Sequence, residues 1–289
     1  MNRENFETGI RKPGFLSEAI IFLILSVFSS SGVFAQSYEA CIDSADYYAG
    51  RKRWKEAERF TVRALRLEPA NKSNWLLWAN LGEIRSRLDD REGALTAYSI
   101  GLSQMPESRK MLSARAALYI EENRIEEALD DLNAALKLDS TLEWPRMMRG
   151  MIMLGENRLK EAEKDFSLLK SQYPENTHAL NGLARIRALE GKPDEAVDLY
   201  AQSLAISPDD DVWFYKITLL ADGGKLQEAS DDLYLAMKQF PRNGNMFLLR
   251  AYIHKLRFEN EEAEIDRKLA LEYGADPSLV ESVFHSEKK

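Results

Sequence analysis

A short pattern that ends in alanine recurs seven times along this chain of 289 residues. Most copies place one or two acidic residues directly before the alanine, as in Leu159–Ala162 and Asn260–Ala263. Successive alanines are spaced by 37, 34, 34, 34, 33 and 34 residues; they are Ala57, Ala94, Ala128, Ala162, Ala196, Ala229 and Ala263. A fixed period of this length predicts stacked copies of one structural unit, each covering apolar surface of its neighbour.

The composition indicates that the repeated unit is helical. The chain holds 69 Ala and Leu residues but only 13 Val and Thr residues. Ala and Leu lose little side-chain entropy in a helix, whereas β-branched residues favour strands. Five of the nine prolines stand twelve residues after a repeat alanine, where they would end the second helix of each unit: Pro69, Pro106, Pro174, Pro208 and Pro241. We therefore expect an all-α protein.

Large and small residues alternate with the same period. Large residues recur at one position ahead of the repeat alanine; they are Trp78, Leu112, Leu180, Trp213 and Phe247. Small residues recur four positions after this large-residue position; they are Gly82, Ala116, Gly150, Ala184 and Ala251. This pattern resembles the tetratricopeptide repeat family. The resemblance implies an α-solenoid, a superhelix of about seven helix-turn-helix repeats, near residues 38–71, 75–108, 109–142, 143–176, 177–210, 210–243 and 244–277.

The repeats depart from the family pattern in places, and the ends need separate treatment. Lys216–Ile217 stands in the sixth repeat where the pattern has Leu-Gly or another small residue. After the seventh repeat, Asp276 and Pro277 suit a helix N-terminus, so we expect a short capping helix there. The solenoid should span residues 36–285 and the tail 286–289, with a hinge at the longer turn 72–74.

The first thirty-five residues are typical of an export signal. Ala19–Phe28 is an uninterrupted apolar stretch, and Val33–Ala35 offers small residues for cleavage before Gln36. The apolar core is shorter than the roughly 20 residues of a membrane-spanning helix. The segment ahead of it carries three acidic and three basic residues, whereas a signal normally begins basic. We expect a periplasmic or secreted protein after cleavage; the alternative is a membrane anchor that stays uncleaved.

The sequence contains no catalytic signature. His178, His254 and His285 lie far apart, and no HExxH, GxSxG, Walker or GxGxxG motif is present. Asp209–Asp211 could suggest a metal, but carboxylates directly before a helix normally cap it. Cys41, the single cysteine, is expected to be a small residue on the first helix. We therefore predict no enzyme activity, no cofactor and no metal.

The family resemblance implies a concave groove lined by the first helix of each repeat, where a protein or peptide ligand binds. The matching positions of repeats four to seven carry methionine, aromatic and a few polar residues. They are Trp144, Met147, Met148, Met151, Asn181, Arg185, Phe214, Tyr215 and Tyr252. Met suits adaptable binding surfaces, and Tyr and Trp often anchor interfaces. The same side chains could instead pack between neighbouring helices.

Net charge constrains the partner. The formal net charge of −8 argues against duplex nucleic acid, because a protein without excess cations releases no counterions on binding. We predict a non-catalytic protein-protein interaction scaffold or adaptor of the bacterial cell envelope. The alternatives are a homo-oligomeric structural protein and a carbohydrate-binding or enzymatic solenoid.

Overall fold

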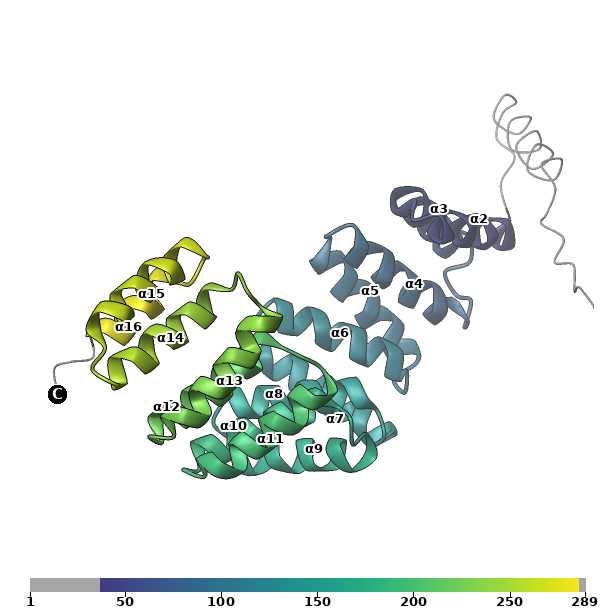
Figure 1. The fold of residues 1–289 in the computed structure, drawn as a ribbon. Coiled ribbons are helices and arrows are strands. Elements are labelled where there is room, and N and C mark those ends of the chain that lie inside the picture. Colours follow the sequence, from purple (N-terminus) through teal and green to yellow (C-terminus); the bar gives the residue numbers. More distant parts are fainter. Residues whose placement is uncertain (1–36, 286–289) are drawn as a thin grey trace, which may run out of the picture. The chain divides into compact units, whose positions relative to one another are not determined.

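The computed structural model describes residues 37–285, and every regular element within that range is a helix (Figure 1). The expected export signal and the tail 286–289 lie outside the described residues. The helices are α2 (Tyr38–Gly50), α3 (Trp54–Leu67), α4 (Asn74–Arg87), α5 (Arg91–Gln104), α6 (Arg109–Glu121), α7 (Ile125–Leu138), α8 (Glu143–Gly155), α9 (Leu159–Gln172), α10 (Thr177–Leu189), α11 (Pro193–Ile206), α12 (Asp210–Asp222), α13 (Leu226–Gln239), α14 (Gly244–Leu256), α15 (Asn260–Glu272) and α16 (Pro277–His285).

Consecutive helices pair, from α2 with α3 to α14 with α15, and α16 follows the last pair. We call the first helix of each pair the A helix and the second the B helix. This arrangement confirms the all-α solenoid predicted from the repeat. Every A–B turn contains one residue in the left-handed region, and these seven residues stand in register: Lys52, Asp89, Asn123, Asn157, Gly191, Gly224 and Phe258. The left-handed residue ends the A helix and lets the next N–H groups bond its last carbonyls.

The chain divides into two compact units, with the boundary between Pro106 and Glu107. The N-terminal unit holds α2–α5, and the C-terminal unit holds α6–α16. The turn 72–74, which is expected to be a hinge, instead lies inside the N-terminal unit and is held there by hydrogen bonds. Asn74 is buried, accepts a hydrogen bond from the Tyr38 hydroxyl at 2.9 Å, and donates one to the Glu68 carbonyl at 2.7 Å. The unit boundary therefore falls one repeat later than the turn length suggests.

Small and large side chains fit together where each A helix meets its B helix. A Cβ on Gly82 would lie 2.6 Å from the Tyr98 ring, and one on Gly150 would lie 3.1 Å from the Phe166 ring. The sixth repeat reverses this choice, with buried Ile217 at the small slot and buried Leu233 at the aromatic slot. The larger residue on α12 is thus matched by a smaller one on α13, which keeps the interior filled.

Ion pairs also join A and B helices, in a pattern that the repeat comparison does not reveal. Arginines at the slot before the small residue pair with aspartates sixteen residues later: Arg115 with Asp131, Arg149 with Asp165 and Arg250 with Asp266. Each arginine donates two hydrogen bonds of 2.6 to 2.7 Å to a carboxylate that is almost fully buried. Lys216 and Asp232 form the equivalent pair in the sixth repeat at 2.7 Å. A buried carboxylate needs such a partner.

The capping helix α16 closes the end of the C-terminal unit, as the sequence predicts. Asp276 accepts from the backbone N–H of Ser278 at 2.7 Å and from its hydroxyl at 2.6 Å, which caps the helix. Val280 is fully buried against Phe247, Leu248 and Ala270. In the described part of the chain, the helices are too short or too polar to cross a membrane.

Candidate partner-binding face

The predicted binding residues lie on the A helices of the C-terminal unit, which we call the A-helix face. On α8, Trp144, Met147 and Met148 are half-buried, and Met151 exposes 47% of its surface. The helix presents these side chains because residues at positions i, i+3, i+4 and i+7 share one side of a helix. The opposite side of α8 buries Met153 and Leu154 in the core. Met151 is thus an adaptable apolar side chain that solvent can reach.

Arg185 of α10 and Tyr215 of α12 meet on this face. The Arg185 guanidinium lies 5.9 Å from the centre of the Tyr215 ring. Tyr215, 45% exposed, stacks on buried Tyr200 with ring centres 6.1 Å apart. Burial raises the pKa of Tyr200 to about 12, so this supporting ring stays uncharged. The arrangement offers an exposed cation on a firmly supported aromatic ring, which suits a carboxylate or a backbone carbonyl.

Asn181 of α10 is half-buried, and its side-chain oxygen is buried without a hydrogen-bond partner. Asn181 and Arg185 are four residues apart, so they share one side of the helix, as the sequence predicts. A buried amide oxygen without a hydrogen-bond partner costs free energy.

A pocket of about 270 Å³ lies at the far end of the A-helix face, between α12, α14 and α16. We call it the C-terminal pocket. Its lining is mainly apolar and consists of Phe214, Thr218, Asp222, Leu248, Leu249, Tyr252, Leu279, Ser282 and Val283. Two predicted residues, Phe214 and Tyr252, meet here. Phe214 also packs against the core beneath α14, so it has a structural role as well.

Two polar groups stand out in the C-terminal pocket. The Tyr252 hydroxyl donates to an Asp222 carboxylate oxygen at 2.6 Å. Burial and this hydrogen bond raise the pKa of Tyr252 to about 12, so it remains a donor at neutral pH. The Thr218 hydroxyl is buried without a hydrogen-bond partner. Thr218 and Asp222 occupy repeat positions equivalent to those that carry Met151 and Gly155 on α8, so their place on the face follows from the repeat. The residues that α16 contributes to the C-terminal pocket depend on how this capping helix docks against α12 and α14.

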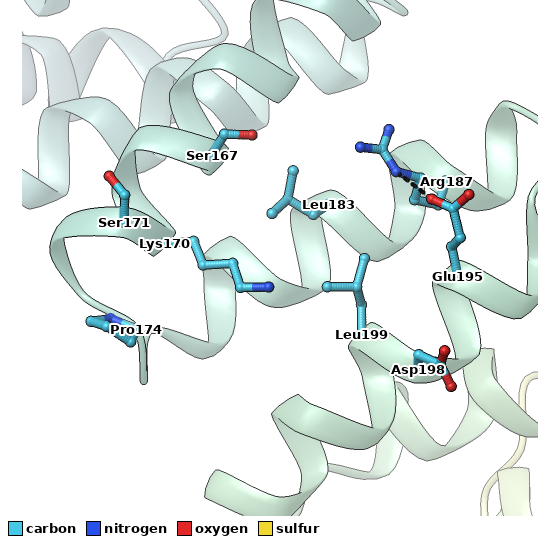
Figure 2. A pocket seen from close by; sticks show the side chains of 9 residues that line it. All are labelled: Ser167, Lys170, Ser171, Pro174, Leu183, Arg187, Glu195, Asp198 and Leu199. Carbon is cyan, nitrogen blue, oxygen red and sulfur yellow. Dashed lines mark ion pairs between the residues drawn. The ribbon is translucent and has the colours of Figure 1, made fainter.

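A second pocket, of about 630 Å³, is formed by α9, α10 and α11 (Figure 2). Leu183 and Leu199 lie at its centre, between Lys170 and an ion pair of Arg187 with Glu195 at 3.0 Å (Figure 2). None of the predicted binding residues lines this pocket, and its side chains are mostly polar.

The two motifs with alternative chemical interpretations, Asp209–Asp211 and Cys41, both make structural contacts. Asp209 accepts from the Val212 N–H at 2.9 Å and caps α12, as predicted. Within residues 37–285, no group of three or more His, Cys, Asp or Glu side chains could hold a metal. Cys41 lies on α2 with no exposed surface, and burial raises the pKa of its thiol. A buried thiol with a raised pKa is a weak nucleophile.

Comparison with known proteins supports the repeat assignment. Residues 110–142 and 147–211 match tetratricopeptide repeat models. A crystal structure of a tetratricopeptide repeat protein from Parabacteroides merdae is 27% identical, covers 86% of this chain and 98% of its own, and superposes with a TM-score of 0.65. YrrB, described as a TPR protein with an unusual peptide-binding site, is 17% identical, with coverages of 69% and 95% and a TM-score of 0.55.

One curated relative bears the name of an enzyme. The human protein O-mannosyl-transferase TMTC1 is 23% identical over 206 residues, which are 70% of this chain. This chain spans 23% of the length of that relative. Residues 110–142 and 147–211 therefore carry tetratricopeptide repeats, and the paired helices of residues 37–285 fold as a solenoid similar to these solved neighbours.

Proposed function

We propose that this protein is a non-catalytic scaffold that binds a segment of a partner protein on its A-helix face. The observation that carries the proposal is the contact of Arg185 with exposed Tyr215, on the same face as exposed Met151. An exposed methionine on the same face as a supported aromatic ring and a cation provides apolar contact together with a hydrogen-bond donor. YrrB, a neighbour with this fold, is described as having a peptide-binding site.

A partner segment would lie across α8, α10 and α12. Its apolar side chains would contact Met151 and Tyr215, and its carboxylate or carbonyl groups would accept from Arg185. The formal net charge of −8 speaks against nucleic acid as the ligand.

The cell envelope remains the proposed location. The support is the apolar stretch Ala19–Phe28 with a cleavage pattern before Gln36. N-terminal sequencing of the protein from an envelope or culture fraction would test it. A first residue at Gln36 is expected, and a retained Met1 would favour the uncleaved anchor.

Site-specific photo-crosslinking in cells tests the binding face. A photoreactive phenylalanine at Tyr215 should give a discrete crosslinked partner, and Arg185→Glu should abolish the product. The matched control is Tyr234 on α13, another exposed tyrosine with a cation, Lys238, 4.3 Å from its ring. Equal crosslinking from Tyr234, or a product that survives Arg185→Glu, would show that the partner does not bind on the A-helix face.

A further inference from the structure

Phe258 is the exception among the seven left-handed turn residues. Five of the other six are Asn, Asp or Gly, which tolerate this conformation well, and the sixth is Lys52. Phe258 has a φ of +64° and exposes 87% of its surface. A bulky residue in the left-handed region is strained, and an exposed phenyl ring gains nothing from burial in its own chain. The repeat requires a left-handed residue at this turn but not a phenyl ring, so the choice of phenylalanine points to a function.

The turn that carries Phe258 is firmly held. The Phe258 N–H donates to the Lys255 carbonyl at 3.0 Å, and the Glu259 N–H donates to the His254 carbonyl at 2.9 Å. The Arg257 guanidinium donates to the Leu226 carbonyl at 3.2 Å and to the Ser230 hydroxyl at 2.8 Å, which anchors the turn to α13. The ring is thus presented on a preorganised support, and binding it would cost little ordering entropy.

The C-terminal pocket has the size and character to take such a ring. It measures about 270 Å³ and is lined mostly by apolar side chains of α12, α14 and α16. An apolar cavity of about 150 Å³ is enough to bind benzene. Phe258 of the same chain does not fill the pocket, because its ring is almost fully exposed. The C-terminal unit therefore carries both an exposed apolar ring and an open apolar pocket.

The turn that carries Phe258 lies near the pocket. The Lys255 carbonyl accepts from the Phe258 N–H, and the Lys255 ammonium donates to the carbonyl of Val283, a pocket residue, at 2.8 Å. Tyr252 lines the pocket from α14, and Phe258 follows six residues later, just beyond the end of the same helix.

A two-fold interface pairs residue i of one subunit with j of the other, and j with i. A surface that carries both an exposed ring and an open apolar pocket has this self-complementary form. Opposite charges also lie at the two features, since Asp222 lines the pocket and Arg257 precedes Phe258. Glu259, directly after Phe258, pairs with His254.

We propose that this protein forms a two-fold dimer through the end of its C-terminal unit, in which Phe258 of each copy enters the C-terminal pocket of the other. The proposal goes beyond partner binding by the A-helix face, because it uses neither Met151 nor the contact of Arg185 with Tyr215. Binding of a partner segment there would leave Phe258 free for self-association.

Sedimentation of the full chain, purified as the cell processes it, tests the dimer. We expect a monomer–dimer equilibrium in the wild-type protein. Phe258→Asn should weaken the dimer by about tenfold or more, as expected for loss of a buried aromatic anchor. The same variant should raise the melting temperature of the monomer, because Asn tolerates the left-handed conformation. Ser282→Trp, which fills the pocket from its exposed rim, should also weaken the dimer.

The controls distinguish this interface from nonspecific hydrophobic association. Tyr234→Asn removes another exposed aromatic ring and should leave the dimer constant unchanged. A mixture of Phe258→Asn and Ser282→Trp should form a weak heterodimer, because one ring and one open pocket remain between them. A monomeric wild type, a dimer that survives Phe258→Asn, or growth beyond the dimer would each overturn the two-fold interface.

Discussion

At the scale of single residues, Gly82 shows how closely the two helices of a repeat approach. A Cβ at this position would lie 2.6 Å from Cε1 of Tyr98, whose ring is buried. The ring cannot move aside without disturbing its neighbours. We therefore expect Gly82→Ala to lower the free energy of unfolding by about 1–3 kcal/mol, the usual cost of overpacking a core. Chemical denaturation followed by circular dichroism would measure it.

The matched control for Gly82 is Gly50, at the end of α2 in the same unit. No atom lies within 4 Å of a Cβ built on Gly50. Gly50→Ala should be neutral or stabilising by up to about 1 kcal/mol, because alanine loses less backbone entropy in a helix. Destabilisation of the same size in both variants would mean that the small slot does not set the helix spacing.

At the scale of paired helices, Asp165 holds α8 and α9 together. It accepts from Arg149 through two hydrogen bonds of 2.7 Å and from buried Arg146 at 3.1 Å. Asp165→Leu would leave two guanidinium groups without their carboxylate. We expect a loss of about 3–5 kcal/mol in the free energy of unfolding, the typical result of breaking a buried ion pair from one side. Thermal denaturation would report it.

An exposed ion pair within the same unit gives the comparison. Arg124 and Glu127 lie 3.0 Å apart, and both side chains are more than one-third exposed. Glu127→Leu should leave the free energy of unfolding nearly unchanged, because solvent screens the pair. If the two leucine variants were equally stable, burial would not control the strength of these contacts.

These elements also show which features the sequence can predict. The helices and the small slots follow from local pattern and spacing, and the structure has them where the repeat places them. The ion pair of Arg149 with Asp165 depends on the antiparallel path of two helices, which brings residues sixteen apart into contact. The C-terminal pocket depends on the docking of α16, and the strain at Phe258 depends on its φ angle. These features can be recognised only from the three-dimensional arrangement of the helices.

At the scale of the whole molecule, α16 should stabilise the array from its end. In stacked repeats each unit contacts only its neighbours, so stability is the sum of local units and the interfaces between them. Val280 is fully buried in the last interface, against Phe247 and Leu248. Val280→Asp would place a carboxylate there without a partner, which is strongly unfavourable. We therefore expect the end of the array to loosen first.

Hydrogen exchange read by mass spectrometry measures how far that loosening spreads. Protection should fall most over residues 244–285, less over residues 177–243, and not at all in the N-terminal unit, which ends at Pro106. The matched control is Ile265→Asp on the neighbouring helix α15, where the side chain is 59% exposed, and this variant should leave protection unchanged. A uniform loss along the chain would show that the repeats unfold as one cooperative block. A graded loss would mean that the two units keep separate stabilities, so partner binding at one need not depend on the other.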